Sequence, residues 1–419
     1  MGVVDTAVMG HVSAVGQAGA GLGNGLFFAV SVFGVGAILG VDPLIAQAIG
    51  AGSPRRARAL LWQGVWSALV VAAGLLVVLC LLPLGLRHFG VPPEQAATAR
   101  AFLAYRTPSI FPLLIFCAAS AYLQAVGREV QMLVMTVVAN VLNLGLDLWL
   151  VFGGLGIPAM GAGGSGLAST LCSMAEIVYL GFLVRSVPLE GPPSSVRPVW
   201  EEMRRIFRVG LPIGMYLTLE SGVFTVAAVM ASWLGAESAA AHQIVLTFAS
   251  LSFTVALGLG IAGSVRVGYA VGARDTQGAR RAGLTALIMG ATFMASSGLF
   301  FALLRHPLVS LLSSQPRVED VAMPLFLVAA AFQISDGLQC VGAGVLRGAG
   351  VSRFTFVANL LGHWGVGLPL ALLFGFRWKL GVTGIWWGLC AGLSAVAVAL
   401  VWKFLSVSSR EMVPLESSP

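Results

Sequence analysis

The stretch RALLWQGVWSALVVAAGLLVVLCLLPLGL, residues 58–86, decides the fold class of this chain. No charged residue follows Arg58 within it, and apolar side chains would cover every side of a helix drawn through it. A helix that crosses the apolar core of a lipid bilayer needs about 20 consecutive apolar residues. The stretch is therefore typical of a membrane-spanning helix.

Ten other stretches have the same character, and the composition agrees with them. Of the 419 residues, 58% are hydrophobic and only 10% are charged, whereas a soluble domain carries about 25% charged residues. A soluble protein is excluded, and no basic run interleaved with aromatic residues suggests a nucleic-acid partner. We place eleven full spans at residues 19–50, 58–86, 96–125, 129–153, 165–187, 205–233, 238–271, 281–304, 321–347, 353–376 and 381–405.

Residues 1–10 form a further apolar segment that is too short to cross the membrane. A first helix entering from the cytoplasm would need about ten more residues. We therefore expect twelve helices, of which helix 1 is truncated at the N-terminus of this sequence.

The Lys and Arg residues predict the orientation. If residues 1–10 count as helix 1, the loops after even-numbered helices and the C-terminal tail hold 16 of the 24 basic residues, and the loops after odd-numbered helices hold 5. Because cytoplasmic loops are enriched in Lys and Arg, both termini are predicted to be cytoplasmic. We expect a multi-pass protein of a bacterial inner membrane that contacts membrane lipids and acts as a monomer.

Similar segments recur at nearly the same offset, 222 residues for the first pair below and 223 for the second. Gly50-Ala51-Gly52 parallels Gly272-Ala273-Arg274, and Leu123 to Gly127 parallels Leu346 to Gly350. These matches predict a parallel pseudo-repeat of two six-helix lobes, an arrangement that transporters use with a substrate cavity between the lobes. The predicted boundaries are an N-terminal lobe at 1–187, a Pro- and Ser-containing cytoplasmic linker at 188–204, a C-terminal lobe at 205–405 and a cytoplasmic tail at 406–419.

Carboxylates inside the spans are the candidate functional residues, because a charge in the bilayer core costs a few kcal/mol. Glu220 and Asp336 lie at the middle of two spans of the second lobe, where a carboxylate could bind a proton, Na⁺ or an organic cation. In the first lobe, Asn143 and Asp147 are four residues apart and should share one helix face. Asp5 is their natural partner from helix 1. Asp42, beside Pro43, is interpreted as structural, and the role of Glu176 is left open.

Two nucleotide-binding motifs are excluded. Residues 161–166, Gly-Ala-Gly-Gly-Ser-Gly, match G-x-G-x-x-G, but they follow a membrane helix instead of a strand and are interpreted as an extracellular turn. A Walker A motif is absent from the sequence. Transport must then be driven by an ion gradient or run downhill, and we expect neither an enzyme nor a cofactor.

Several segments resemble the MATE family (multidrug and toxic compound extrusion), most of all its NorM-like members. The similarity runs nearly end to end, and the segments that carry it are Val4-Asp5-Thr6-Ala7, Pro43 to Ala48 with Gly50, Asn143 to Asp147 followed by Phe152-Gly153, Ala241-His242-Gln243-Ile244, Arg266-Val267-Gly268, Gln333-Ile334-Ser335-Asp336 and Val345 to Gly350.

The resemblance implies a twelve-helix, all-α transporter that exports cationic, amphipathic drugs in exchange for H⁺ or Na⁺. By position, Asp5, Asn143 and Asp147 match the cation site of the first lobe, and Thr170 resembles its member from helix 6. Glu220 and Asp336 match the acids of the second lobe, and the resemblance implies that Na⁺ could bind to them. Phe332, one turn before Asp336, stands where some NorM-like proteins have Tyr.

Two alternatives remain. A flippase for lipid-linked oligosaccharides has a related architecture, but it would favour a basic cavity, and Arg266 is the mid-span cation that the sequence offers. The incomplete first helix also allows a truncated remnant that transports nothing.

Overall fold

The computed structural model describes Asp5, Val8, Met9 and residues 14–86, 91–154, 156–189, 196–313 and 315–415, and nearly all of these residues are helical. The predicted first helix lies mostly outside them, although Asp5, Val8 and Met9 are helical and buried. The helices are α2 (Ala14–Ile38), α3 (Val41–Gly50), α4 (Pro54–Gly85), α5 (Pro93–Arg106), η1 (Thr107–Ser109), α6 (Ile110–Ala125), α7 (Glu129–Phe152), α8 (Ala162–Ser186), α9 (Trp200–Trp233), α10 (Ala236–Gly272), α11 (Thr276–Leu312), α12 (Pro316–Gly348), α13 (Ser352–Asn359), η2 (Leu360–Gly367), α14 (Leu368–Leu372), η3 (Leu373–Arg377) and α15 (Gly381–Ser408).

The eleven predicted spans are confirmed by length and composition. Within the described residues, eleven helical segments are long and apolar enough to cross a membrane. Helix α7 shows why the surrounding solvent must be lipid: it exposes Leu133 and Val137 while it buries Asn143 and Asp147. This inside-out arrangement would be unstable in water, because exposed apolar surface and buried charge both cost free energy.

Four of the described spans are irregular, and one of them, α11, departs from helical geometry at Leu304. The span at residues 93–125 consists of α5, the short 3₁₀ turn η1 and α6, and the span at 352–377 alternates between α-helix and π-helix. The span at 16–50 breaks between α2 and α3. Pro108 lies in η1 and cannot donate a backbone hydrogen bond, which explains the interruption of the span at 93–125. Interrupted helices in transporters are common at sites of ion and substrate binding.

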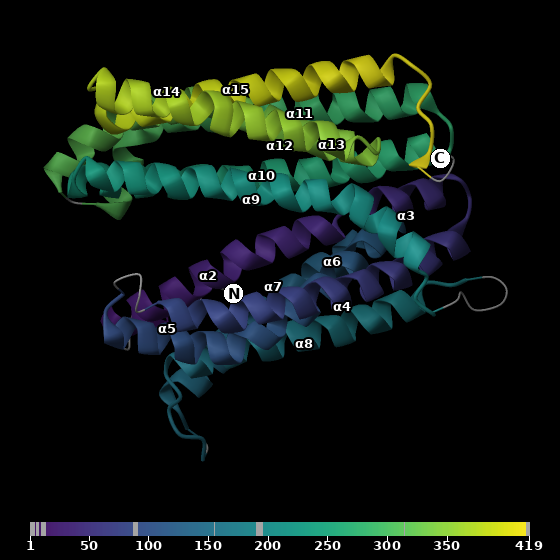
Figure 1. The fold of residues 1–419 in the computed structure, drawn as a ribbon, viewed down its shortest axis with the longest axis horizontal. Helices are drawn as coiled ribbons and strands as arrows, with labels where there is room; N and C mark the ends of the chain where they lie inside the picture. The colour runs from purple at the N-terminus through teal and green to yellow at the C-terminus, as the bar shows by residue number, and fades with distance from the viewer. Residues whose placement is uncertain are drawn as a thin grey trace. The chain divides into compact units, whose positions relative to one another are not determined.

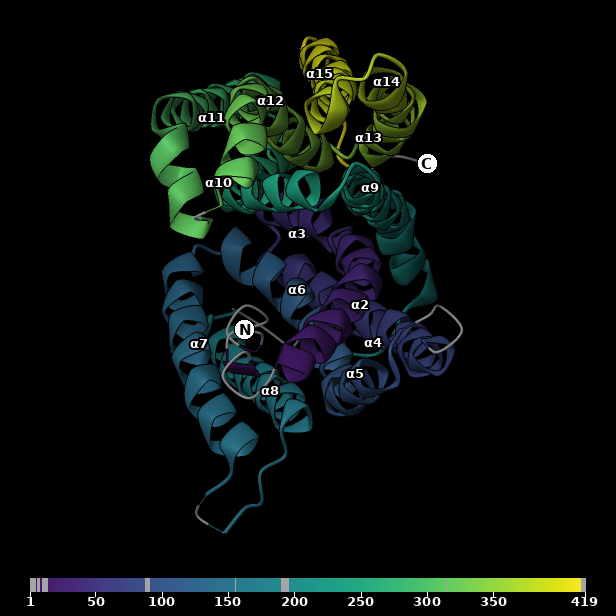
Figure 2. The same ribbon diagram turned by 90° about the vertical axis from the view of Figure 1, so that its left-hand side faces the viewer.

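The chain divides into two units of internally connected helices. Unit 1 contains α2, α4 to α8 and the beginning of α9 up to Gly214. In it, α7 packs on α8, α5 on both α2 and α8, and α4 on α6, and Figure 2 shows the segment between α7 and α8 extending beyond the ends of both helices. Close contacts depend on glycine: a Cβ at Gly210 of α9 would collide with the Ala37 carbonyl of α2.

Unit 2 contains the rest of α9 and α10 to α15, and helix α3 belongs to it although α3 lies early in the sequence. Helix α12 packs against α10, α11 and α15, and in Figure 1 the long helices of this unit run alongside one another. The central position of α12 explains why so many of its residues are buried. The predicted lobes and the two observed units differ in α3 and in the first half of α9.

The segments that suggested a repeat occupy equivalent helix ends. Helix α3 ends at Gly50 and α10 at Gly272, and Gly52 and Arg274, each two residues later, both have positive φ (70° and 57°). Likewise Gly127 and Gly350, which follow α6 and α12, have φ of 76° and 80°. Each pair ends its helix with the left-handed conformation that glycine adopts most readily. Arg274 adopts it without being glycine.

Helix α3 is held in unit 2 by a buried ion pair and by amide hydrogen bonds. Arg347 Nε lies 3.6 Å from Asp42 Oδ2, and both side chains are about 95% buried. Gln47 Nε2 donates to the Gly348 carbonyl at 3.1 Å, and Gln47 Oε1 accepts from the Leu415 amide at 2.8 Å. The structural interpretation of Asp42 agrees with this arrangement.

This ion pair generates a prediction about stability. Because a buried charge without its partner is costly, Asp42→Ala or Arg347→Ala alone should destabilise the protein by about 3–5 kcal/mol. The double variant Asp42→Leu with Arg347→Met removes both charges and should recover most of that loss. Thermal unfolding of the detergent-purified protein measures both effects, and equal stability of the single and double variants would contradict the assignment.

Candidate functional site

Two groups of buried polar side chains stand out, one in each unit. The unit 1 cluster consists of Asp5, Asn143, Asp147 and Ser169. The unit 2 cluster consists of Glu220, Asp336, Gln339 and Asn359. Each contains two of the four carboxylates to which the sequence assigned function.

In the unit 1 cluster, α7 supplies Asn143 and Asp147. They are four residues apart on one helix, so they share a face, and both have no exposed surface. The same helix presents Leu and Val to the outside, so the apolar surroundings orient the polar pair inward. The predicted Asn/Asp face is therefore observed inside unit 1.

A chain of hydrogen bonds connects this face to Asp5. Ser169 Oγ of α8 donates to Asp5 Oδ2 at 2.8 Å, and Asn143 Nδ2 donates to Ser169 Oγ at 3.4 Å. The carboxyls of Asp5 and Asp147 also interact electrostatically with each other. The structure thus brings together Asp5, Asn143 and Asp147, as the sequence suggested.

Thr170 is placed differently. Its hydroxyl donates to the Tyr105 carbonyl at 2.7 Å, and among the described residues Ser169 is the α8 side chain that bonds to Asp5. The glycine-rich segment before it is not the predicted turn: α8 begins at Ala162, so most of that segment forms the first turns of the helix. Glycine suits those turns because a Cβ at Gly164 would collide with the Leu150 carbonyl of α7.

Much of the hydrogen-bonding capacity of the unit 1 cluster is unused. Both carboxylate oxygens of Asp147, Oδ1 of Asp5 and Oδ1 of Asn143 form no hydrogen bond of good geometry within the described part of the chain, although Asp5 and Ser165 are close polar neighbours of the Asp147 carboxyl. The buried hydroxyl oxygen of Ser165 also forms no hydrogen bond of good geometry within the described residues. Buried polar atoms are nearly always satisfied, so such a set of oxygens is suited to receive a proton or a small cation.

Sequence reasoning missed one charged neighbour of this cluster, Arg106 at the end of α5. Its side chain is 9% exposed and interacts electrostatically with Asp5, Glu176 and Asp147. The available signal was a basic residue inside an apolar span, Arg106, which lies deeper in the span than Arg100, since such residues are rare and often functional.

In the unit 2 cluster, one amide links two helices to a carboxylate. Gln339 Nε2 of α12 lies 3.2 Å from Glu220 Oε2 of α9 and 3.2 Å from Asn359 Oδ1 of α13, and can donate to both. Asp336 precedes Gln339 by one turn of α12 and interacts electrostatically with Glu220. The two predicted acids are therefore neighbours. Gln339 could have been found from its spacing to Asp336, whereas nothing local to Asn359 indicated its partner.

Phe332 provides no oxygen to this cluster. Its ring packs edge-on against Phe224 and Trp386, with centroids 6.1 and 5.5 Å away. Trp386 Nε1 in turn donates to Nδ1 of the buried His242 at 3.1 Å. One turn before Asp336, α12 therefore offers an aromatic wall and no cation ligand.

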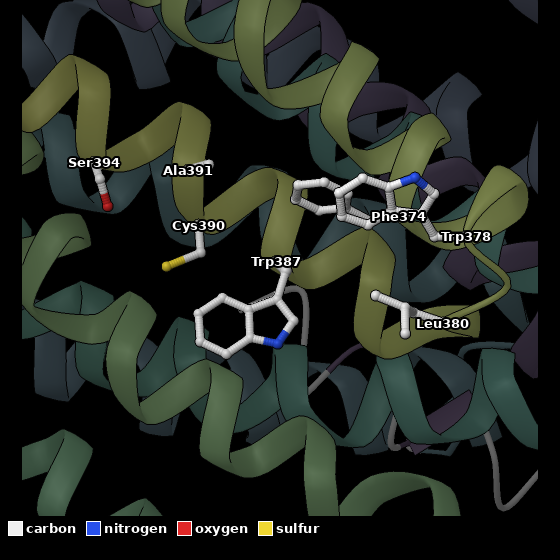
Figure 3. A pocket seen from close by; sticks show the side chains of 7 residues that line it. All are labelled: Phe374, Trp378, Leu380, Trp387, Cys390, Ala391 and Ser394. Carbon is white, nitrogen blue, oxygen red and sulfur yellow. The ribbon is translucent and has the colours of Figure 1, made fainter.

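Two of the hollows within the described part of the chain lie in unit 2. A small one between α9, α10 and α12 is lined by Tyr216, Glu220, Gln339 and Cys340 among others, so the unit 2 cluster borders a cavity. The other is a groove between η3 and α15 (Figure 3), with no charged residue in its lining. Its polar Ser394 is engaged with Ser335, 2.7 Å between the hydroxyl oxygens. The groove is lined by Phe374, Trp378, Leu380, Trp387, Cys390, Ala391 and Ser394.

Comparison with known proteins places this arrangement in a family. The MatE family profile matches residues 1–149 and 212–373. A probable multidrug resistance protein NorM from Mesorhizobium japonicum is 35% identical over 418 residues, covering 97% of this chain and 89% of its own length. The multidrug resistance protein NorM of Burkholderia vietnamiensis is 33% identical, covering 99% and 91%.

Solved structures show the same fold. The eukaryotic MATE transporter AtDTX14 superposes with a TM-score of 0.84 at 23% identity, covering 96% of this chain and 90% of its own. A multidrug resistance MATE family transporter of the MOP superfamily, solved in an outward-facing conformation, gives 0.87 at 18% identity, covering 99% and 92%. The expected all-α membrane fold is confirmed, and the chain belongs to the MATE family of transporters, among its NorM-like members.

Proposed function

We propose that this protein is a secondary active antiporter that exports cationic, amphipathic drugs and toxins in exchange for H⁺ or Na⁺. Its relatives from Mesorhizobium japonicum and Burkholderia vietnamiensis are named as multidrug resistance proteins. The observation that carries the proposal for this chain is the pair Glu220 and Asp336, two neighbouring buried carboxyls inside unit 2, of which Glu220 lines a small cavity.

Such a pair favours exchange because of its charge. Two carboxylates close together in apolar surroundings cannot both stay ionised without a cation or a proton. A drug cation and a coupling ion can each neutralise the negative charge of the pair. Once one of them is bound, the carboxyls attract the other less strongly. Exchange requires this kind of differential affinity between states. Asp5, Asn143 and Asp147 offer a second such site in unit 1.

The surroundings of Asp336 favour a proton as the coupling ion. Na⁺ needs several oxygen ligands at short distance, and Phe332 supplies none. A proton needs a single carboxylate oxygen. The protein acts in this proposal as a monomer in the inner membrane, with both termini in the cytoplasm and organic cations as its substrates.

Asp336→Asn tests the site directly. The amide cannot take up a proton or hold a cation by charge, so ethidium efflux from cells should fall to the level of cells without the protein, at an unchanged amount in the membrane. Asp320→Asn, an exposed acid near the start of the same helix, should transport normally. Wild-type efflux by Asp336→Asn would rule out this residue as the coupling site.

The choice of ion can be measured in proteoliposomes that contain the wild-type protein. We expect dissipation of the proton gradient to stop ethidium export, and replacement of Na⁺ by K⁺ to leave it unchanged. Export that requires Na⁺ and ignores the proton gradient would reverse the ion assignment. Export that survives the loss of both gradients would contradict antiport itself.

A further inference from the structure

The groove between η3 and α15 is a surface of unit 2 that the proposed exchange does not use. Its volume is about 430 Å³, within the range of about 300–1,000 Å³ that small-molecule sites cover. Its walls are almost entirely apolar, and the single hydroxyl in its lining, that of Ser394, is already engaged with Ser335. The groove is therefore suited to a hydrocarbon chain.

Aromatic rings and a short turn fix the shape of the groove. The Phe374 and Trp378 rings are stacked, with centroids 4.7 Å apart and an angle of 27° between their planes, and Trp387 of α15 contributes a third ring (Figure 3). The Trp378 amide donates to the Leu373 carbonyl at 2.9 Å, and the Leu380 amide donates to the Phe374 carbonyl at 3.1 Å. These contacts hold the walls in place within unit 2.

One end of the groove lies at the level of the membrane surface. The span that contains η3 ends at Arg377, and the next span begins at Gly381. The two tryptophans of the lining are 59% and 45% exposed, and tryptophan is enriched at the boundary between lipid headgroups and hydrocarbon. Ser394, the lining residue farthest along α15, lies about 20 Å along the helix axis from Gly381. The groove thus runs from the headgroup level into the apolar core.

Two basic residues flank Trp378 at the surface end. Arg377 precedes it and Lys379 follows it, both are exposed, and neither forms an ion pair with a described carboxylate. Lys379 has a φ of 58°, in the left-handed region that glycine adopts most readily, so a charged side chain stands where glycine would fit with less strain. An anion is therefore the polar group that suits this end of the groove.

We propose that this groove binds an anionic phospholipid, with one acyl chain along η3 and α15 and the phosphate beside Arg377 and Lys379. Charge disfavours an organic cation as the occupant, because the lining contains no carboxylate and the adjacent charges are positive. A zwitterionic lipid fills the groove equally well but gains less from the two cations, because its headgroup has no net charge. The site does not depend on which ion drives export.

Native mass spectrometry of the purified full chain tests the lipid preference without any variant. Phosphatidylglycerol and phosphatidylcholine with the same acyl chains are added in turn to the delipidated protein. We expect phosphatidylglycerol to bind at a several-fold lower lipid concentration. Equal binding of the two lipids would overturn the inference.

The basic pair is tested by Arg377→Gln combined with Lys379→Gln. This double variant should bind phosphatidylglycerol several-fold more weakly than wild type and no better than phosphatidylcholine. The matched control, Arg305→Gln with Arg317→Gln, removes two charges that are predicted on the same side of the membrane and that lie outside the groove, and it should keep the wild-type preference. A preference that survives in the first double variant, or an equal loss in both, contradicts the assigned headgroup position.

The acyl-chain part of the site is tested by Ala391→Phe, which fills the groove with a ring and should weaken binding of both lipids several-fold. Ala395→Phe adds the same ring to an exposed position of α15 outside the lining, and it should bind lipid as wild type does. If Ala391→Phe does not fold, Ala391→Leu is compared with Ala395→Leu in the same way. Wild-type binding by the Ala391 variant, or an equal reduction at both positions, shows that the chain lies elsewhere.

Discussion

The cost of placing a charge in apolar surroundings is the constraint on which this structure depends. Each buried charge must be paired, hydrogen-bonded, neutralised by a proton or held ready for a cation. The buried groups of this chain divide along these lines. Asp42 and Arg347 satisfy one another and fix α3 in unit 2. Asp147 has no ion-pair partner among the described residues, and its polar neighbours are the second acid Asp5 and the hydroxyl of Ser165.

Interrupted spans make the candidate sites possible. A continuous helix satisfies its own backbone and presents few groups to a ligand. The break at Thr107–Ser109 leaves Arg106 at a helix end, and π-helical turns directly follow Asn359, the hydrogen-bond partner of Gln339. Close packing through glycine then brings such groups together, as at Gly166 and Gly210. Helix interruptions thus expose polar groups to a ligand, and small residues allow the helices that carry those groups to pack closely.

The two clusters differ in the residues that surround their buried carboxylates. In unit 2 the neighbouring acids Glu220 and Asp336 lie beside the neutral amide of Gln339, and Arg347 of that unit already has a partner. In unit 1 Ser169 bonds to Asp5, and the nearby Arg106 has no ion-pair partner among the described residues. If the repeat arose from one ancestral unit, the two halves have diverged in how they balance charge.

The sequence by itself determined the membrane class, the eleven spans and the acids Asp5, Asp147, Glu220 and Asp336, because uninterrupted apolar length and mid-span charge are local properties of the chain. It also paired Asn143 with Asp147, since helical spacing puts them on one face. Only the tertiary structure decided that Ser169 meets Asp5 while the adjacent Thr170 bonds to Tyr105, because one residue of helical rotation turns a side chain by about 100°. It alone placed α3 in unit 2, joined Asn359 to Gln339, and left Arg106 without a described ion-pair partner. Those outcomes depend on contacts between residues that are distant in sequence, which no local pattern encodes.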